Sequence, residues 1–294
     1  MRRRRTGPRS TVTAVRPPNP QASVIVPTIG RPEQLGSCLA ALCAANPPPD
    51  EIVVVDQSGA RVARDVAAAC GDARVRVVDD EGRGPARARN RGAQAARGRL
   101  LLFIDDDCEA DPTWVGIARR LCLEHPGALL TGQVTAIGDR NAVPSVREDP
   151  DPRDYTGKLA WAALYSGNMA VVRDDLLSFG GFDERLPSGE DNDLCYRWLR
   201  AGRMLRYEPD LIVTHMDWRT PEELDQVRTD YSRAQGMFYA KHLRAGDLRV
   251  LWFLLGDLRT VLRIRLAGEP ARTPGVPAIT QMLHSIPRNW RRFR

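Results

Sequence analysis

The sequence has 294 residues, of which 43% are hydrophobic, so it can bury the core of one large domain or of a domain with an appendage. Its formal net charge is +6, and residues 1–20 contain six arginines and no acidic residue, so the basic and acidic side chains of the remainder balance. The excess charge lies in a Pro-rich tail, which argues against nucleic acid as a partner of the folded part.

From residue 22 to about residue 125, apolar strand-like runs alternate with amphipathic helical stretches. The predicted strands cover 22–28, 51–56, 74–79 and 99–105, and the predicted helices cover 31–45, 60–70, 84–96 and 113–125. Continuous apolar strands that alternate with helices predict a parallel sheet covered by helices on both faces.

After residue 128 the strand-like runs are shorter and are separated by loops. Strands are predicted at 128–137, 167–172 and 204–209, a mobile loop at 138–157, and two helices within 222–266. We therefore expect four parts along the chain. They are a disordered basic tail at 1–21, the main domain at 22–220, a helical extension at 221–268 and a flexible basic tail at 269–294.

The compartment is predicted from three features of the sequence. No apolar run reaches the ~18 residues that a spanning helix needs, and no apolar segment follows the arginines of residues 2–5, as it would in a signal peptide. The six cysteines form no CxxC pair and most lie in apolar helical runs, which favours reduced thiols. We expect a cytoplasmic protein.

Three consecutive aspartates, Asp105–Asp107, directly follow the apolar run 99–104. Ligands bind at the carboxyl ends of strands in open parallel sheets, and carboxylates clustered there suit Mg²⁺ or Mn²⁺ together with substrate phosphates. A plain helix cap is the alternative, and it fits Asp111 better. A calcium loop is excluded by Ala110 at its glycine position, and "GRGPAR" (82–87) does not match a dinucleotide fingerprint.

A second acidic cluster comprises Glu190, Asp191 and Asp193 at the start of a predicted helix. Acidic residues are favourable at a helix N-terminus, so capping is one explanation. The other is that this helix, which has an apolar face, directs a carboxylate into a cleft.

Two further stretches hold candidates for the same site. In "GPARARNRGAQAARG" (84–98), Arg89 and Asn90 are placed to face a ligand, although such a stretch taken alone is more often solvated. His215 ends the apolar run of "IVTHMDW", where a lone histidine is usually structural unless a metal is near.

Taken together, these segments resemble one family. "SVIVPTIGRPEQLGSCLAAL", "EIVVVDQSG", "GPARARNRGAQAARGRLLLFIDDDCEADPTW", "GNMAVVRDD" and "GEDNDLCYRWLRAG" follow one another in the order found in family 2 glycosyltransferases with the GT-A fold. The resemblance covers roughly residues 22–218. It implies an α/β fold with a mostly parallel sheet flanked by helices, a nucleotide-binding half, an acceptor half, and C-terminal helices.

The resemblance also implies an activity. It is that of an inverting transferase that moves a sugar from a nucleoside-diphosphate sugar to an acceptor hydroxyl, in glycan, glycolipid or natural-product biosynthesis, with Mn²⁺ or Mg²⁺. The residues carried over are Pro27, Thr28, Arg31, Asp56, Arg89, Asn90, Asp105 and Asp106 for the donor; Asp107, Asp105 and His215 for the metal; Asp191 as base, with Glu190 as its rival; and Gly167 and Asn168 for the acceptor. The chain departs from the family at 57–59, where "QSG" replaces the more usual "D(D/N)GS".

Two other functions remain open at this point. A nucleotidyltransferase that forms sugar nucleotides has a related sheet, but it needs a glycine-rich basic loop after the first strand, and "PTIGRPEQL" has one glycine and one arginine. A non-catalytic binding module would not need both Asp107 and Asp191.

The stretch "DLRVLWFLLGDLRTVLRIRL" (247–266) places apolar residues on one helical stripe flanked by arginines. One interpretation is an interfacial helix on anionic lipid, which would suit a lipid-linked acceptor and a position at the inner face of the membrane. The other is a stripe that packs on the domain or on a second copy of the chain.

Overall fold

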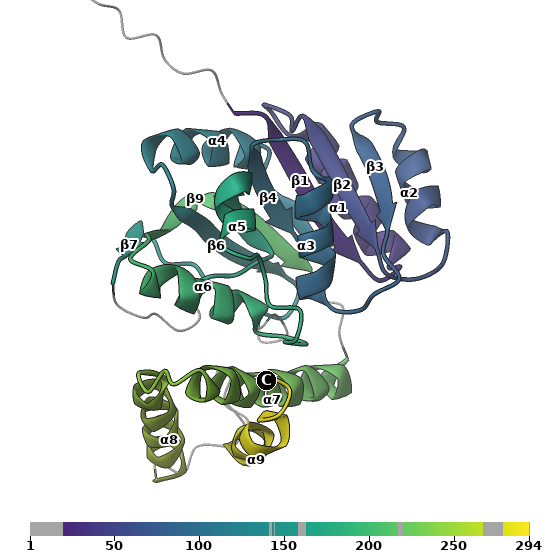
Figure 1. Cartoon of the computed structure of the whole chain (residues 1–294). Coiled ribbons are helices and arrows are strands. Elements are labelled where there is room, and N and C mark those ends of the chain that lie inside the picture. Colours follow the sequence, from purple (N-terminus) through teal and green to yellow (C-terminus); the bar gives the residue numbers. More distant parts are fainter. Residues whose placement is uncertain are drawn as a thin grey trace, which may run out of the picture.

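The computed structural model of the chain describes residues 20–140, 143, 145–157, 163–216, 220–266 and 279–293. One mixed sheet carries helices on both faces, and a further layer of helices lies beside it (Figure 1). The strands are β1 Ala22–Thr28, β2 Glu51–Asp56, β3 Val75–Asp79, β4 Leu100–Ile104, β5 Cys108–Ala110, β6 Leu129–Ile137, β7 Arg153–Tyr155, β8 Asn168–Val172 and β9 Leu205–Met216. The helices are α1 Pro32–Ala44, α2 Val62–Cys70, α3 Pro85–Ala95, α4 Trp114–Glu124, α5 Arg173–Ser178, α6 Glu190–Arg200, α7 Pro221–Arg244, α8 Val250–Leu266 and α9 Ile279–Asn289.

The sheet has a parallel half and a mixed half. Its strand order is β3-β2-β1-β4-β8-β6-β9-β5, and β7 pairs with β9. β3, β2, β1 and β4 are parallel, because each is connected to the next along the chain by a helix that crosses over the sheet. β8 is antiparallel to both β4 and β6, and β9 is parallel to β6 but antiparallel to β5 and β7. The predicted α/β class and the mostly parallel first half are confirmed.

The core lies on both faces of the sheet. Side chains of β1 alternate, so that Val24 and Val26 pack on one face against α1 and α4, and Ile25 packs on the other face against α3 and α6. Leu39 of α1 and Trp198 of α6 are completely buried in these two clusters. Burial on both faces explains why the strands read as continuous apolar runs.

Two sequence predictions in the second half were wrong. Residues 138–157 were expected to be a loop, but β7 pairs with β9 and Arg147 forms a bridge with Val134. The strand expected at 204–209 continues to Met216, with a register shift opposite Gly132 and Gln133. Pro209 breaks the strand-like pattern in the sequence, whereas the bulge lets the strand continue past it.

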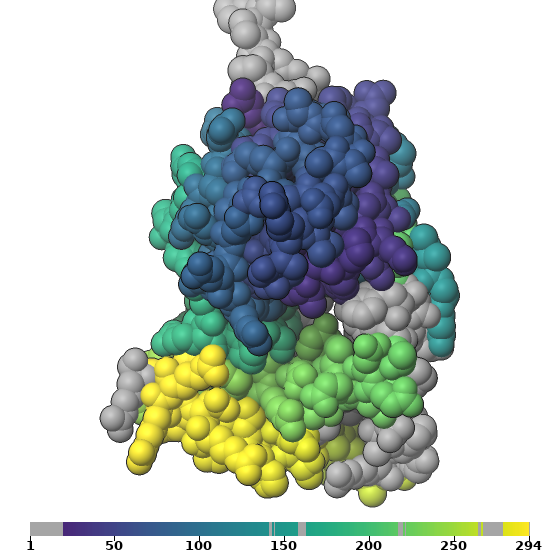
Figure 2. All heavy atoms as spheres, turned by 90° about the vertical axis from the view of Figure 1, so that its right-hand side faces the viewer, coloured from purple at the N-terminus to yellow at the C-terminus, as the bar shows by residue number. Residues whose placement is uncertain are grey.

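The C-terminal helices form a layer of their own. The two helices predicted within 222–266 are α7 and α8, but the tail predicted at 269–294 contains α9, which packs against α7 (Figure 2). A Cβ on Gly236 would lie 2.2 Å from the carbonyl oxygen of Met282, so glycine is what allows the two helices to approach so closely. The sequence missed α9 because it is short and has Pro287 near its end. The predicted tail 1–21 lies almost wholly outside the described residues, and the boundary near 220 stays a prediction.

Candidate active site

The parallel half of the sheet brings the predicted residues to one edge. β1 pairs with β2 so that Thr28 lies beside Asp56, and β1 pairs with β4 so that Ile25 lies beside Phe103. The loop after β4 therefore starts level with the end of β1. Thr28 Oγ1 donates a hydrogen bond of 2.6 Å to Asp106 Oδ2, which ties the two strand ends together.

Of the three aspartates, Asp106 points into the protein. It is completely buried and binds Thr28 and the Arg31 guanidinium. Burial raises the pKa of Asp106 to about 6, although Arg31 and Thr28 act in the opposite direction. The Asp106 side chain thus holds the loop on β1, and its predicted contact with the donor stays a prediction.

Asp107 and His215 form the candidate metal centre. β5 pairs with β9 with Cys108 opposite His215, which places the His215 Nε2 atom 3.6 Å from Asp107 Oδ1. His215 Nδ1 lies 3.0 Å from the Met216 carbonyl oxygen, so the tautomer with a proton on Nδ1 donates there and leaves Nε2 as a ligand. One carboxylate oxygen and one imidazole nitrogen suit Mn²⁺.

Two neighbours of this pair have other roles. The Cys108 sulfur also lies within 4.8 Å of the two ligand atoms, but Mg²⁺ and Mn²⁺ are hard cations that prefer oxygen ligands, so a soft thiol is a poor ligand for them. Arg31 Nη1 lies 3.1 Å from Asp107 Oδ2, on the carboxylate oxygen that does not face His215. A guanidinium there is placed to meet the negative charge of a diphosphate.

Arg89 connects the end of β4 with the start of α6. Its Nη2 lies 2.6 Å from Asp105 Oδ1, and its Nη1 binds Glu190. Arg89 is buried, so it organises the two carboxylates, whereas the sequence predicted a contact with the nucleotide.

Asp105 is fixed on both of its oxygens. Besides Arg89, the Tyr165 hydroxyl donates a hydrogen bond of 2.9 Å to Oδ2. Burial alone would raise the pKa of Asp105, but the charge of Arg89 and the Tyr165 hydroxyl hold it below the usual value. Among the described residues, the groups that could share a metal ion include Asp107 and His215 and do not include Asp105. Its predicted role as a metal ligand is not supported, and it remains a candidate on the donor side.

The two predicted acceptor residues, Gly167 and Asn168, have close contacts within the protein. Asn168 is completely buried, and its amide binds the Gln133 and Leu211 carbonyl oxygens and the Trp114 indole, so it joins strands of the sheet. Gly167 lies beside Asp105, where an added Cβ would come within 2.6 Å of Oδ2. Asn168 thus holds strands together and Gly167 makes room for Asp105, and the predicted acceptor contacts of both residues stay predictions.

Asn90 also has a structural role. Its amide donates to the Phe182 carbonyl oxygen and to Glu184 Oε1, each at 2.9 Å, and accepts from the Phe182 backbone nitrogen. These bonds fix the loop that leads to α6. They thereby help to position the second acidic cluster, and the predicted donor contact of Asn90 stays a prediction.

The other predicted donor residues lie at the ends of β1 and β2. Pro27 is half-buried, and Asp56 is 3% exposed, with Oδ1 accepting a hydrogen bond of 2.8 Å from the Ser58 nitrogen. Gln57 Nε2 donates a hydrogen bond of 2.8 Å to Asp80 Oδ2. Residues 57–59, where the sequence differs from the family pattern, thus stabilise the neighbouring loop through Gln57 and hold the Asp56 side chain through the Ser58 backbone nitrogen.

The two acids that begin α6 differ in their surroundings. Glu190 is buried against Arg89, and burial together with neighbouring Asp191 raises its pKa to about 7. Asp191 is only half-buried, and it accepts hydrogen bonds from the backbone nitrogens of Asn192, at 2.7 Å, and of Ser166. Burial raises the pKa of Asp191 as well. Of the two, Asp191 has the more accessible carboxylate.

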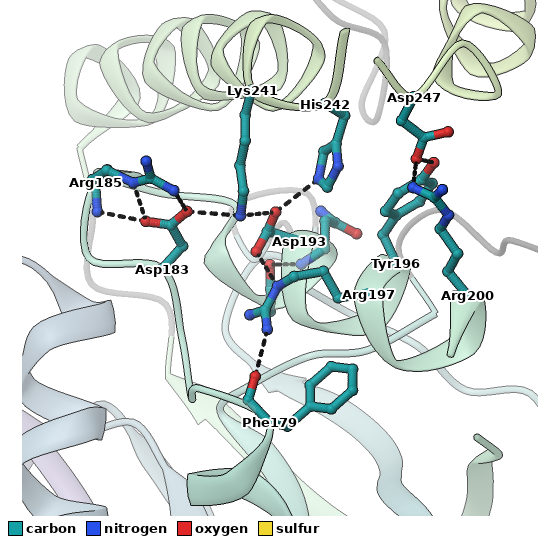
Figure 3. A network of polar contacts seen from close by, with 12 residues as sticks. Phe179, Asp183, Arg185, Asp193, Tyr196, Arg197, Arg200, Lys241, His242 and Asp247 are labelled. Atoms are coloured by element: carbon teal, nitrogen blue, oxygen red, sulfur yellow. Dashed lines mark hydrogen bonds and ion pairs between the residues drawn. The ribbon is translucent and has the colours of Figure 1, made fainter. Parts of the chain in front are cut away.

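The third acid of the cluster faces the C-terminal helices (Figure 3). Asp193 is completely buried and accepts hydrogen bonds from Arg197 at 2.7 Å, from Lys241 at 2.5 Å and from His242 at 2.9 Å. Lys241 also binds Asp183, at 2.7 Å, in the loop before α6. This network joins α6 to α7, so Asp193 fixes the helix that carries Asp191 and is excluded as a base.

Replacing Asp193 with asparagine is expected to lower the free energy of unfolding by about 3–5 kcal/mol at pH 7, because two partly buried cations and a buried histidine lose the completely buried carboxylate that they share. Burial alone would raise the pKa of Asp193, but His242, Arg197 and Lys241 lower it. Its contribution is therefore fully present above the unfolded pKa of about 3.9 and is lost progressively as the pH falls from there toward the lower pKa of the folded state.

Urea unfolding at pH 7 and at pH 3 checks this expectation. The difference between wild type and variant should shrink at the lower pH. Asp79→Asn is the matched control, since Asp79 is paired with Arg64 on the surface and is expected to change stability by no more than about 0.5 kcal/mol. Equal effects of the two substitutions would contradict the network's role.

Several residues of the site were not found from the sequence. Tyr165, Ser166, Asp183, Lys241 and His242 belong to no motif, and their partners lie far away along the chain. The one signal in the sequence was for Tyr165 and Ser166, which are polar residues directly before the "GNM" segment.

Comparison with known proteins identifies the family of the chain. The family model described as "Glycosyl transferase family 2" matches residues 23–178. Residues of this chain are 32% identical over 150 residues to a pre-mycofactocin glycosyltransferase of Mycobacterium tuberculosis, covering 47% of this chain and 31% of that protein. They are 28% identical over 253 residues to glycosyltransferase AglE of Haloferax volcanii, covering 81% of this chain and 82% of that protein. The chain thus spans about a third of the first relative and most of the second.

Solved structures show the same fold. S. aureus TarS residues 1–349 in complex with UDP-GlcNAc matches with a TM-score of 0.59 at 20% identity, over 74% of this chain and 65% of that one. The mannosyltransferase PcManGT from Pyrobaculum calidifontis, in complex with GDP-Man and Mn2+, matches with a TM-score of 0.58 at 19% identity. The match covers 77% of this chain and 65% of that one. With the family model matched over more than half of its length, the chain belongs to glycosyl transferase family 2 and has the GT-A fold.

Proposed function

We propose that this protein is an inverting glycosyltransferase that moves a sugar from a nucleoside-diphosphate sugar to an acceptor hydroxyl with the help of a divalent cation. The observation that supports this most is the pairing of Asp107 with His215 at the sheet edge, next to a separate helix N-terminus that carries Asp191. An inverting transfer needs charge compensation for the leaving group and a base for the nucleophile, from different segments of the chain.

The donor side would be built from the ends of β1, β2 and β4. Pro27, Thr28 and Asp56 would line the nucleoside pocket, and Arg31 would bind the diphosphate from beside Asp107. Asp107 and His215 would hold Mn²⁺ or Mg²⁺, which when bound neutralises charge on the departing diphosphate. TarS and PcManGT, with UDP-GlcNAc and GDP-Man in their structures, support the class of donor and leave the base and the sugar open.

The acceptor side would depend on Asp191. Its carboxylate would take the proton of the acceptor hydroxyl as the oxygen attacks the anomeric carbon. Arg89 would hold Asp105 and Glu190 in place, and the Asp193 network would fix α6. Together these contacts would fix the start of α6, where Asp191 lies. We propose a cytoplasmic location, in keeping with six cysteines that are all present as thiols.

A thermal-shift panel of UDP-, GDP- and dTDP-sugars, with and without Mn²⁺, tests the proposal on the full chain. A donor at about 100 times its dissociation constant is expected to add about 2.7 kcal/mol to the free energy of unfolding, and only when the cation is present. No stabilisation by any donor with Mn²⁺ would count against the proposal.

The chemistry of the product separates the proposed transferase from the two other functions. A transferase releases nucleoside diphosphate when an acceptor hydroxyl is supplied. A nucleotidyltransferase would release pyrophosphate from a nucleoside triphosphate, and a binding module would release neither.

A further inference from the structure

Helix α8 has one face packed and the opposite face exposed. Val250, with Phe253 and Leu254, packs into a small core with aromatic residues of α6 and α7. The exposed apolar residues recur at spacings of three, four and seven, which places them on one side of a helix that begins just after Leu248. They are Leu248, Leu251, Trp252, Leu255, Leu262 and Leu266, called here the α8 stripe.

The exposure of the α8 stripe is large. Trp252 is 74% exposed and Leu266 79%. Exposed tryptophan and leucine side chains in this number, on a single helix, go beyond the scattered apolar residues of an ordinary surface and indicate an interaction site. None of the helices in the described part of the chain has the length and hydropathy needed to cross a bilayer, so a membrane contact here would lie along the surface.

The charges around the stripe are of one sign. Residues 248–266 contain four arginines and one acid, Asp257. Asp257 is turned toward α7, where its Oδ2 accepts hydrogen bonds of 2.5 Å from Gln235 and from Tyr239. Arg249, Arg259 and Arg263 are exposed beside the stripe. The outward-facing charge of this helix is therefore positive.

Helix α9 repeats the pattern. Leu283 of α9 and Trp290, directly after the helix, have exposed apolar side chains, and residues 279–293 contain three arginines and no acid. Figure 1 shows α8 and α9 on the side of α7 that is turned away from the sheet. The layer thus presents exposed tryptophans, leucines and arginines on helices that lie beyond α7 as seen from the sheet.

We propose that the α8 stripe is a docking surface for an anionic lipid bilayer. Leucine and tryptophan side chains would insert at the level of the headgroups, and the arginines beside them would bind lipid phosphates. Charge complementarity favours lipid over a second copy of the chain, because two copies would bring like-charged arginines together across the contact. The surface is separate from the donor edge, so it stands independently of the proposed activity.

Flotation with vesicles tests the proposal on the full chain. At low salt the protein is expected to float with vesicles of 70% phosphatidylcholine and 30% phosphatidylglycerol, and to float much less with phosphatidylcholine alone. Leu251→Glu with Trp252→Glu should lower binding to the anionic vesicles at least about tenfold, since the stripe then carries charge into the headgroup region. Arg259→Gln with Arg263→Gln should lower it by about fivefold per arginine.

The matched control is Ala40→Glu with Ala69→Glu, which adds the same two charges at exposed positions of α1 and α2 and should bind as wild type does. No flotation with anionic vesicles at low salt would overturn the proposal. So would equal loss in the stripe variant and the control. Light scattering that shows a dimer, dissociated by the stripe substitutions in a protein that does not float, would assign the stripe to a second copy instead.

Discussion

Replacing Asp191 with asparagine is expected to lower turnover by about 10²–10⁴-fold, the usual contribution of a positioned general base. Asparagine keeps the size of the side chain and can still accept a hydrogen bond from the Asn192 backbone nitrogen, but it cannot take a proton. Donor affinity in the presence of Mn²⁺ should stay near the wild-type value, because Asp191 lies on α6 and the candidate metal ligands lie on β9 and in the loop after β4.

Single-turnover measurements with a saturating donor would isolate the chemical step. Glu190→Gln is the matched comparison: it changes the neighbouring carboxylate, which binds Arg89, and should alter turnover less than Asp191→Asn does. If Asp191→Asn keeps more than about a tenth of wild-type turnover with chemistry rate-limiting, Asp191 is not the base. A larger loss in Glu190→Gln would transfer the role to Glu190.

The pH dependence gives a second readout of the same residue. Because burial raises the pKa of Asp191, the acid limb of the wild-type kcat profile should lie above the ordinary aspartate pKa of about 3.9. The base is active when deprotonated, so turnover should rise with pH through this limb. In Asp191→Asn the residual activity should lose it.

Replacing Asp107 with asparagine is expected to remove most of the Mn²⁺-dependent stabilisation by donor. The substitution takes away the one carboxylate of the Asp107–His215 pair, and a neutral amide oxygen is a weaker ligand for a hard cation. In the thermal-shift assay, the gain of about 2.7 kcal/mol expected with a donor at 100 times its dissociation constant should largely disappear.

Two comparisons make this result specific. Glu109→Gln removes a carboxylate two residues along the chain and should keep the Mn²⁺-dependent gain, since Glu109 is not part of the candidate metal group. His215→Gln should lose it, because Nε2 is the second ligand atom. The melting temperature without ligand shows whether each variant is folded. Wild-type donor affinity with Mn²⁺ in Asp107→Asn would refute the metal assignment.

Arg31 is expected to follow a different pattern from Asp107. It approaches Asp107 from the oxygen that does not face His215, and it also binds buried Asp106. Its loss would therefore affect both the loop after β4 and the binding of a diphosphate. Because Arg31 has both contacts, substituting it would test the metal site less specifically than substituting Asp107 or His215.

The fold of the first half of the chain could be predicted because its strands and helices are marked by local sequence patterns. Apolar strands that alternate with helices specify parallel pairing, and parallel pairing places all strand carboxyl ends on one edge. Parallel pairing was therefore enough to predict from the sequence that Asp105–Asp107 lie near Thr28 and Asp56. The second half was less readable because its strands pair across loops, and β7 and the end of β9 are fixed by their partners.

Long-range contacts decided the roles of individual polar residues. Arg89 and Glu190 are 101 positions apart, and Asp193 and His242 are 49 apart. Nothing in the local sequence of either partner indicates the other. For the same reason, the sequence could not separate Asp191 from Glu190 and Asp193 by burial, whereas the structure assigns each a different partner.

The sequence by itself determined the fold class, the edge of the sheet that holds the site, the aspartates after β4 and the acidic start of α6, because each depends on residues close together in the chain. Only the tertiary structure decided that Asn168 and Asn90 hold the scaffold, that His215 pairs with Asp107 and Asp105 with Arg89, and that α9 completes a C-terminal layer. A polar side chain acquires its role from the partner that folding brings to it. That partner is fixed by the packing of the whole chain, since a buried polar group must be satisfied wherever it comes to lie.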